Sequence, residues 1–301
     1  MRAEHTLISP GSELALYEGT HSALNDPENL FAKYPHQPGY AAVGRVEESG
    51  ASVAAPAPGE RILFLGRHET WSVLQARDSI WVRAPADLPV EKLLFARLVQ
   101  IAATGAFCLR SRPERAVVLG AGLIGILAAQ VLRAQGVREI VVQDVNGARL
   151  ALAARCGLRG ALGEGLSLAA SVRELGAEPD AIIEATGVPG LVPPALAAVR
   201  RRGDVVLLGS PRGSAEIDLY KLLHRKGLAL MGAHEAMLPD RAPPGSPSRQ
   251  ALLEQAVEWL RRGDVVVDGL MTDVVRPDEL PAVYERISAD KNVLGVVVAW
   301  T

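Results

Sequence analysis

The sequence predicts an α/β protein in which a doubly wound parallel sheet follows a smaller β-rich unit. Two observations lead to this prediction. Residues 1–104 alternate short apolar runs with glycine and proline, whereas from Ala116 onward apolar runs alternate with helical patterns of about a dozen residues. Strands that alternate with helices form parallel sheets, because a crossover helix returns the chain to the starting edge.

The first part of the chain contains three predicted strands. They cover residues 39–46, 61–65 and 79–82. Pro56, Pro58 and Gly59 mark the turn between the first two strands. From residue 90 to residue 109 the apolar spacing becomes helical, which ends the β-rich part.

The second part contains predicted strands over residues 116–119, 139–143, 180–184, 204–208 and 228–231, and helices over 124–135, 147–155 and 189–200. A proline-rich loop follows. We expect Ser246 to cap a helix that begins at Pro247 and runs through Leu260. The tail then supplies a helix over 277–287 and a last strand over 295–299.

Length and composition exclude several functional classes. A chain of 301 residues favours two domains, and a net charge of −2 gives no general attraction to nucleic acid or anionic lipid. The longest apolar stretch, 116–132, is interrupted by glycines and fits a strand, turn and helix better than a membrane span. The N-terminus does not predict a signal peptide, and with two cysteines the expected compartment is the cytoplasm. We expect a small-molecule substrate.

Gly120, Gly122 and Gly125 form a G-x-G-x-x-G pattern between a predicted strand and a predicted helix. Gly120 permits a tight turn, Gly122 lets the backbone approach a pyrophosphate, and Gly125 lets the helix pack closely against the strand. The helix N-terminus, at Leu123 and Ile124, offers N–H groups to phosphates. The alternative is a glycine-rich turn with no ligand.

Asp144 stands 19 positions after the last of these glycines, at the end of the next predicted strand. A carboxylate there accepts hydrogen bonds from ribose hydroxyls and repels a 2′-phosphate. The pattern therefore predicts a Rossmann domain that binds NAD(H) rather than NADP(H). The alternative is a surface turn carboxylate, because Asn146 and Gly147 follow it.

The chain resembles the medium-chain dehydrogenase/reductase family over nearly its whole length. The resemblance is carried by residues 9–14, 38–46, 184–187, 203–209 and 295–298 together with the glycine pattern. The chain is similar to polyol- and threonine-dehydrogenase-like members, and its Ser-Pro-Gly-Ser-Glu stretch is similar to bacteriochlorophyllide dehydrogenases. The resemblance implies a GroES-like catalytic domain over residues 1–104, a Rossmann domain over 105–233, and a segment, 234–301, that returns to the catalytic domain.

The resemblance also implies cofactor contacts. Arg149 would meet the ribose beside Asp144, although a solvated helix charge is the alternative for this arginine. At the carboxyl ends of two later strands the implied contacts are Thr186, Gly187, Gly209 and Ser210. We expect the protein to be a homodimer or a homotetramer.

Members of this family that bind zinc have ligands at positions where this chain has none. Pro10 stands in place of a cysteine, Tyr40 and Ala41 in place of a His-Glu pair, and the third position falls on Arg97 or Gln100. None of these residues supplies a thiolate, imidazole or carboxylate. The resemblance therefore predicts a zinc-free member with no metal site. The chain also begins later than family members usually do, by about one β-hairpin.

Ser12, Tyr40, His68 and Arg97 are the candidates for catalysis without a metal. Hydride transfer to a carbonyl requires a group that stabilises the developing alkoxide and gives it a proton. Ser12 matches a hydroxyl of the family's proton relay, Tyr40 can donate from a ligand position, and histidines such as His68 suit acid–base work near neutrality. The structural alternatives are a turn cap for Ser12, a core aromatic for Tyr40 and an exposed loop histidine for His68.

These inferences predict an NAD-dependent, zinc-independent oxidoreductase that interconverts a secondary alcohol and its ketone. The expected substrate is a cyclic polyol, a sugar or a biosynthetic intermediate. Two alternatives stay open at this point: a zinc-free quinone or enone reductase, and a catalytically silent NAD-binding protein that acts as a sensor or scaffold.

Overall fold

The chain divides into two compact units, and the computed structural model describes residues 1–29 and 31–300. One unit comprises residues 1–100, 238–263 and the chain from Leu270 to the C-terminus, and we call it the mixed-sheet unit. The other comprises residues 101–237 and 264–269, and we call it the parallel-sheet unit. Among the described residues, no helix combines the length and the apolar character that a bilayer crossing requires.

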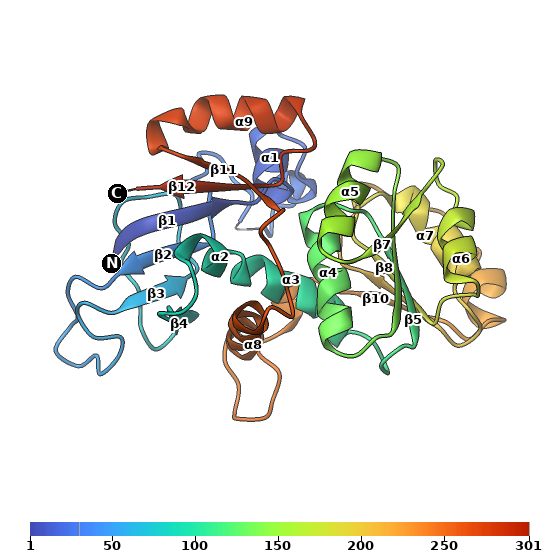
Figure 1. The fold of residues 1–301 in the computed structure, drawn as a ribbon, viewed down its shortest axis with the longest axis horizontal. Coiled ribbons are helices and arrows are strands. Elements are labelled where there is room, and N and C mark those ends of the chain that lie inside the picture. The colour runs from blue at the N-terminus through green and yellow to red at the C-terminus, as the bar shows by residue number, and fades with distance from the viewer. Residues whose placement is uncertain (30, 301) are drawn as a thin grey trace. The chain divides into compact units, whose positions relative to one another are not determined.

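The mixed-sheet unit is built on six strands in the order β11-β12-β1-β2-β3-β4. Their bounds are β1 (Arg2–Ile8), β2 (Ala42–Arg45), β3 (Arg61–Phe64), β4 (Trp81–Arg83), β11 (Met271–Val275) and β12 (Gly295–Ala299). Strand β1 pairs antiparallel with both β2 and β12, so the two ends of the chain share one sheet (Figure 1). This strand was not predicted, because polar residues interrupt its apolar pattern.

The helices of this unit cover the sheet and close its core. They are α1 (Ser12–Tyr17), α2 (Val90–Leu94), the first residues of α3 (Ala96–Phe107), α8 (Arg249–Arg262), α9 (Leu280–Ala289) and 3₁₀ turns at Ser22–Asn25 and Pro277–Glu279. Helix α9 packs on β1 and β12 through an apolar cluster that includes Ile8, Val283, Ile287 and Val298.

The start predicted for α8 was wrong by two residues. Ser248, in extended conformation, is the N-cap, and its hydroxyl accepts a hydrogen bond from the Ala251 N–H at 3.1 Å. Ser246 instead belongs to the preceding turn, where its N–H donates to the carbonyl of Pro243. The helix therefore begins at Arg249, beyond the last proline of the loop.

The parallel-sheet unit confirms the predicted doubly wound sheet. Its six strands run in the order β10-β9-β8-β5-β6-β7, and every neighbouring pair is parallel. Their bounds are β5 (Arg115–Leu119), β6 (Glu139–Asp144), β7 (Arg159–Leu162), β8 (Ala181–Glu184), β9 (Asp204–Leu207) and β10 (Ala229–Gly232). Strand order reverses between β5 and β8, and such a switch point is where open α/β sheets bind ligands.

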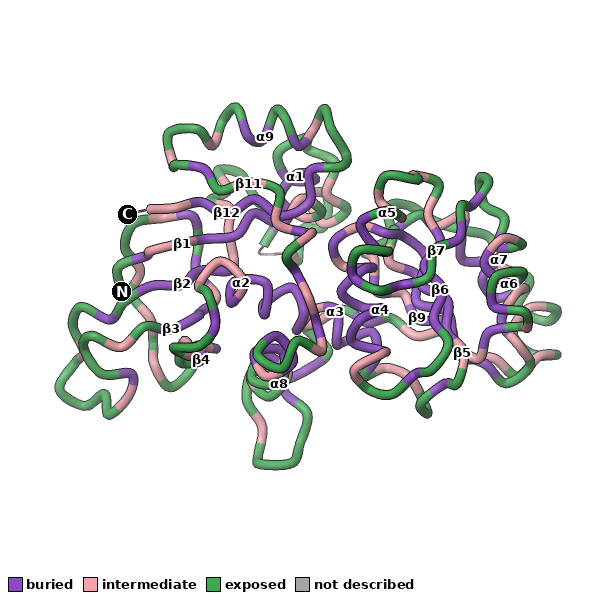
Figure 2. The backbone as a smooth tube through the Cα atoms, in the orientation of Figure 1, coloured by how far each residue is buried: buried purple, intermediate pink, exposed green. Residues whose placement is uncertain are grey.

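Helices cover both faces of the parallel sheet. They are α4 (Leu123–Ala134), α5 (Gly147–Arg155), α6 (Ala169–Leu175) and α7 (Val192–Ala198), with 3₁₀ turns at Pro189–Leu191 and Glu235–Met237 and a π-helix at Leu219–His224. Figure 1 shows α4 and α5 on one side of the sheet and α6 and α7 on the other. The central strands and α4 are almost continuously buried (Figure 2), as expected for strands covered on both faces.

Candidate functional site

The glycine turn joins β5 to α4 in the geometry that the sequence predicts. Gly120 has a φ of +99°, and a Cβ on Gly125 would lie 1.8 Å from the Gly120 carbonyl oxygen, so strand and helix approach too closely for any side chain. A Cβ on Gly122 would meet no protein atom within 4 Å. The space in front of Gly122 is therefore open to a ligand.

The start of α4 directs backbone donors toward this open space. Gly122 is the N-cap, and the first bond of the helical ladder runs from the Ile126 N–H to the Gly122 carbonyl at 3.0 Å. The preceding N–H groups of Leu123 and Ile124 lie outside that ladder. A helix N-terminus of this kind favours an anion such as a phosphate.

Asp144 ends β6 beside the glycine turn. Its Oδ2 accepts a hydrogen bond from the Ala121 N–H at 2.7 Å, and its Oδ1 accepts one from the Asn146 N–H at 2.8 Å. The half-buried carboxylate is thus anchored to the turn that would carry the phosphates, rather than projecting freely from a surface loop. Arg149 follows in the first turn of α5 and is also half-buried.

The loops after β8 and β9 lie next to each other at the carboxyl ends of the strands, as the glycine turn and Asp144 do. Glu184 is buried and accepts hydrogen bonds from the Thr186 hydroxyl and N–H and from the Gly187 N–H. Burial raises the pKa of Glu184, and the bonds from Thr186 oppose that rise. A Cβ on Gly187 would lie 2.4 Å from the Ser210 carbonyl oxygen, and one on Gly209 would lie 2.5 Å from the Gly187 nitrogen.

Close packing therefore joins the glycine turn to these two loops. A Cβ on Gly120 would approach the Thr186 methyl group to 2.8 Å. The structure thus brings the predicted cofactor residues together at the carboxyl ends of β5, β6, β8 and β9, within one unit. They are Gly120, Gly122, Leu123, Ile124, Gly125, Asp144, Thr186, Gly187, Gly209 and Ser210.

A buried hydrogen-bonded cluster lies in the mixed-sheet unit and consists of Thr6, Glu13, His68, Tyr284 and Trp300. Glu13 Oε2 accepts from the Tyr284 hydroxyl at 2.6 Å and lies 3.0 Å from His68 Nε2. His68 Nδ1 lies 2.8 Å from Thr6 Oγ1, which also accepts from Trp300 Nε1 at 2.9 Å. We call these five residues the buried polar cluster.

The hydrogen-bonding partners restrict where the protons of this cluster lie. The Glu13 carboxylate is an acceptor, so His68 donates from Nε2 to Glu13, and in the neutral ring Nδ1 then accepts from the Thr6 hydroxyl. Burial and the negative charge of Glu13 raise the pKa of Tyr284, which keeps this hydroxyl a donor.

The exposed-loop alternative for His68 was wrong, because the residue is 9% exposed. Both of its ring nitrogens are engaged with Thr6 and Glu13, which supports a positioning role. Sequence reasoning missed Glu13 and Tyr284 as partners. Glu13 directly follows the candidate Ser12, but nothing in the sequence links it to a tyrosine 271 residues away.

Tyr40, Arg97 and Gln100 form a second group in the mixed-sheet unit. The Arg97 guanidinium carbon lies 5.1 Å from the centre of the Tyr40 ring, and Arg97 Nη1 donates to Gln100 Oε1 at 2.7 Å. Arg97 is 3% exposed, whereas Tyr40 is half-buried. A cation over an aromatic face is an attractive arrangement. Ser12, the first residue of α1, is half-buried next to Glu13.

Part of the parallel-sheet unit is similar to a known family. In this unit we call the glycine turn and Asp144 the cofactor cradle, after their expected ligand. Residues 124–244 match the family described as zinc-binding dehydrogenase. L-threonine 3-dehydrogenase of Shewanella baltica is 38% identical over 124 residues, which cover 40% of this chain and 36% of that protein. This stretch of the chain is therefore similar to zinc-binding dehydrogenases of the medium-chain type. The matched stretch spans little more than a third of those dehydrogenases.

The fold of the whole chain is similar to that of several dehydrogenases of known structure. A short-chain alcohol dehydrogenase of Escherichia coli, complexed with NADH, superimposes with a TM-score of 0.82 at 19% identity, covering 99% of this chain and 90% of that one. L-Idonate 5-dehydrogenase of Escherichia coli gives 0.80 at 18% identity, covering 99% and 90%. A zinc-binding dehydrogenase of Sinorhizobium meliloti, bound to NADP, gives 0.75 at 19%, covering 99% and 91%. At these identities the likeness shows the fold.

The residues at the expected zinc positions do not offer this metal its usual ligands. Thiolate, imidazole and carboxylate are the protein ligands of zinc, and Pro10, Tyr40, Ala41 and Arg97 provide none of them. A buried guanidinium repels a divalent cation. Over residues 1–29 and 31–300, no group of three histidine, cysteine, aspartate or glutamate side chains is arranged to hold a metal ion.

Proposed function

We propose that this dehydrogenase interconverts a secondary alcohol and its ketone with NAD(H) and without zinc. The observation that carries the proposal is the anchored pair of glycine turn and Asp144 at the switch point of the parallel sheet. Relatives and structural neighbours are named as dehydrogenases of threonine, butanediol and idonate, which all carry secondary alcohols. A polyol, a sugar or a related intermediate is the substrate class that this likeness supports.

In this proposal the parallel-sheet unit holds the cofactor. The N–H groups at Leu123 and Ile124 bind the phosphates over Gly122, and Asp144 accepts from the ribose hydroxyls with Arg149 beside it. The loops at Thr186 and Gly209 line the rest of the crevice. The carboxylate favours NAD(H), since it repels a 2′-phosphate. When bound, the nicotinamide supplies or accepts the hydride.

The mixed-sheet unit supplies the catalytic groups in this proposal. Arg97, which with Gln100 is one of two candidates for the third ligand position of zinc members, holds a positive charge against the Tyr40 ring. A fixed charge in a water-poor site stabilises a developing alkoxide at no cost of reorganisation. Tyr40 holds the proton at its hydroxyl, and Ser12 is the second donor. The buried polar cluster keeps α1 and the His68 loop in place.

We further propose that residues 1–104 and 234–301 form the catalytic domain and residues 105–233 the cofactor domain. The observed units support this assignment, since the cofactor cradle lies in one of them and all four catalytic candidates lie in the other.

The cofactor assignment is tested by Asp144→Ser. Loss of two hydrogen bonds to a carboxylate should weaken NADH binding by about 10- to 100-fold and reduce the difference in affinity between NADH and NADPH. Calorimetric titration of both cofactors measures this. Glu139→Ser, an exposed carboxylate at the other end of β6, is the matched control and should bind NADH like the wild type. Equal affinity of the wild type for NADH and NADPH would contradict the proposal.

The reaction is tested by NADH consumption with cyclic and acyclic ketones, and by NAD⁺ reduction with the matching alcohols. Turnover of these substrates supports the proposal. Turnover confined to quinones or conjugated enones would make the protein a reductase of carbon–carbon double bonds. Tight NADH binding without turnover of any carbonyl substrate would support the silent, cofactor-sensing alternative.

A further inference from the structure

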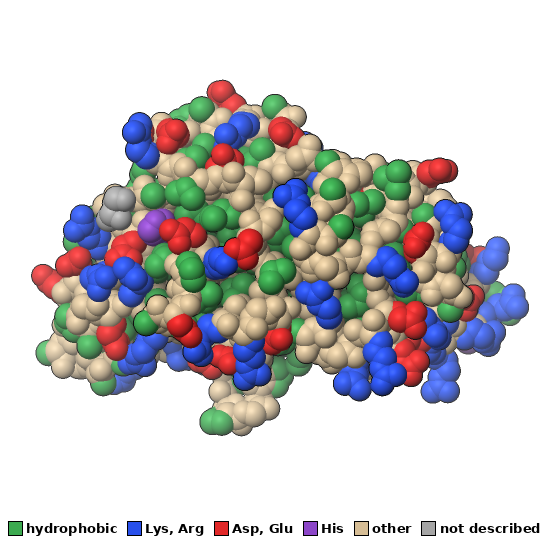
Figure 3. Space-filling view, in the orientation of Figure 1, with side chains coloured by type: hydrophobic (Ala, Val, Ile, Leu, Met, Phe, Trp, Pro, Cys, Tyr) green, Lys and Arg blue, Asp and Glu red, His purple; other side chains and the backbone are tan. Residues whose placement is uncertain are grey.

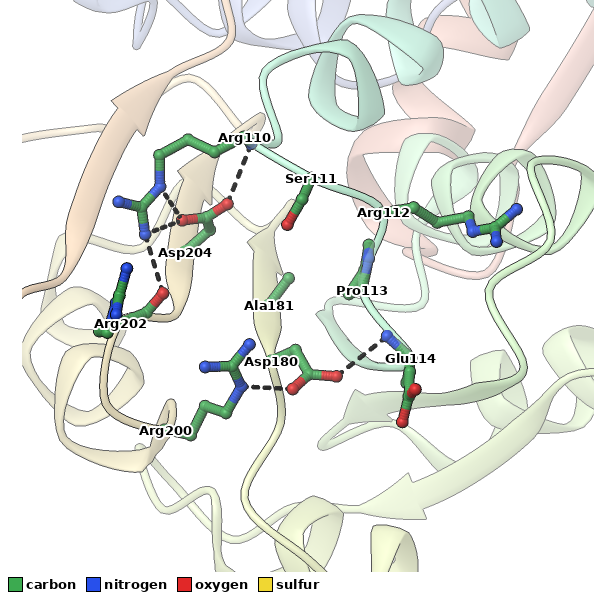
Figure 4. Close-up of a pocket in the computed structure, with 10 residues that line it drawn as sticks. All are labelled: Arg110, Ser111, Arg112, Pro113, Glu114, Asp180, Ala181, Arg200, Arg202 and Asp204. Carbon is green, nitrogen blue, oxygen red and sulfur yellow. Dashed lines mark hydrogen bonds and ion pairs between the residues drawn. The ribbon is translucent and has the colours of Figure 1, made fainter.

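A cavity lies at the amino ends of strands in the parallel sheet, away from the carboxyl ends that carry the cofactor cradle. Its volume is about 670 Å³, and Figure 4 shows the ten residues that line it. They come from three segments that lead into neighbouring strands: 110–114 into β5, 180–181 into β8 and 200–204 into β9. The cavity therefore faces the amino ends of the strands whose carboxyl ends carry the cradle.

Two arginine–aspartate pairs build the wall of this cavity. Arg110 donates from Nε to Asp204 at 2.6 Å, and from Nη2 to the carbonyls of Arg202 and Gly203. Arg200 donates from Nε to Asp180, whose other oxygen accepts from the Glu114 N–H at 2.9 Å. These bonds fix two guanidinium groups. Nη1 of Arg110 and Nη2 of Arg200 make no hydrogen bond to a described residue.

Arg202 stands between these pairs and differs from both. Its φ is +60°, and among the described residues no other non-glycine residue has a positive φ. Its N–H donates to the Lys226 carbonyl at 2.9 Å. Its guanidinium makes no hydrogen bond or ion pair with any described residue. A left-handed backbone at a residue with a long side chain persists only where its surroundings hold it, and such positions concentrate at functional sites.

The charges do not balance on this wall. Figure 4 shows the guanidinium groups of Arg110, Arg202 and Arg200 on one side of Ala181, while Arg112 points away on the other. The ten lining residues include four arginines and three carboxylates, Glu114, Asp180 and Asp204, which leaves a net charge of +1. Asp204 and Asp180 pair with Arg110 and Arg200, whereas Arg202 has no carboxylate partner among the described residues. Guanidinium groups bind phosphate oxygens through paired N–H donors, and the volume lies within the usual range for small-molecule sites, about 300–1,000 Å³.

We propose that this cavity binds a small phosphate-bearing anion, with Arg202 as the main contact and Arg110 and Arg200 as prearranged donors. The site does not depend on the proposed enzymatic activity. Because the cavity lies at the amino ends of these strands and the cofactor cradle at their carboxyl ends, the anion and the dinucleotide can bind at the same time.

Inorganic pyrophosphate is the probe, titrated calorimetrically into the full chain at constant ionic strength. Arg202→Gln should weaken binding at least about tenfold, since it removes a charge-assisted contact. Arg202→Lys keeps the charge but not the paired donors, and its affinity should fall between the two. Arg138→Gln, at an exposed arginine outside the cavity lining, is the matched control and should leave affinity within about twofold of wild type.

Pyrophosphate also resembles the phosphates of a dinucleotide, so the cradle needs its own variant. Gly122→Asp places a carboxylate in the cradle, and binding that survives this change but is lost in Arg202→Gln supports the proposal. Binding that is lost in Gly122→Asp and unchanged in both Arg202 variants would overturn it, and so would the absence of any binding to the wild type. Melting temperatures of all variants show that each is folded.

Discussion

At the scale of single residues, the proposed chemistry depends most on Tyr40 and the charge beside it. Arg97 is nearly completely buried, and burying a charge is costly unless a partner offsets the loss of water. The Tyr40 ring and the Gln100 carbonyl oxygen supply part of that compensation. A cation buried at this cost beside the half-buried Tyr40 is consistent with the proposed catalytic role.

Tyr40→Phe should lower turnover by about 10²–10³, the usual effect of removing one donor to a developing oxyanion, and leave NADH affinity unchanged. Steady-state rates on an accepted substrate and a cofactor titration measure the two effects. If Tyr40 served only as packing, Tyr40→Phe would be almost silent and only Tyr40→Ala would cost stability, by a few kcal/mol. Full activity in both Tyr40→Phe and Ser12→Ala would move the proton donor elsewhere.

At the scale of elements, two glycines of the glycine turn are needed for different reasons: Gly125 for packing and Gly122 for ligand binding. Gly125 faces the carbonyl of Gly120 at a distance that no Cβ tolerates, whereas Gly122 faces open space. The two glycines belong to one pattern, yet different neighbours make them necessary: the protein's own strand for Gly125, and a ligand for Gly122.

Gly125→Ala should therefore lower the free energy of unfolding by about 1–3 kcal/mol and weaken NADH binding as well. Gly122→Ala should cost less than about 1 kcal/mol in stability while reducing NADH affinity sharply. Urea unfolding and cofactor titration separate the two outcomes. Gly147→Ala, at the start of α5 with no neighbour near its added Cβ, is the control and should change neither property appreciably. Normal NADH affinity in Gly122→Ala would show that the cofactor does not approach this turn.

An element could be predicted from the sequence when its own residues show how it is buried. β5, β6, β8 and β9 are buried on both faces, so their apolar runs stand out in the sequence. The edge strand β7 was missed because only Ala161 in it is buried. The buried polar cluster could not be predicted, since its contacts join residues at opposite ends of the chain and each residue alone has an ordinary neighbourhood.

At the scale of the whole molecule, the protein should fold and bind NADH without zinc. Protein purified from zinc-containing medium should hold less than about one tenth of a zinc ion per chain by elemental analysis, since the ligands that zinc requires are missing. Chelator treatment should leave its melting temperature unchanged. One tightly bound zinc per chain, or a melting temperature that falls with chelator, would contradict this expectation.

The position of β1 in its sheet also determines the order in which the chain can fold during synthesis. Its partner β12 ends at Ala299, so at 5–20 residues per second about 15 to 60 s pass between the synthesis of the two strands. All six strands of the parallel sheet are complete by Gly232. The parallel sheet can therefore be complete before the mixed sheet, although β1 to β4 are synthesised first. A ribosome that stalls before residue 295 would hold a chain with a finished parallel sheet and an N-terminal strand without its second partner.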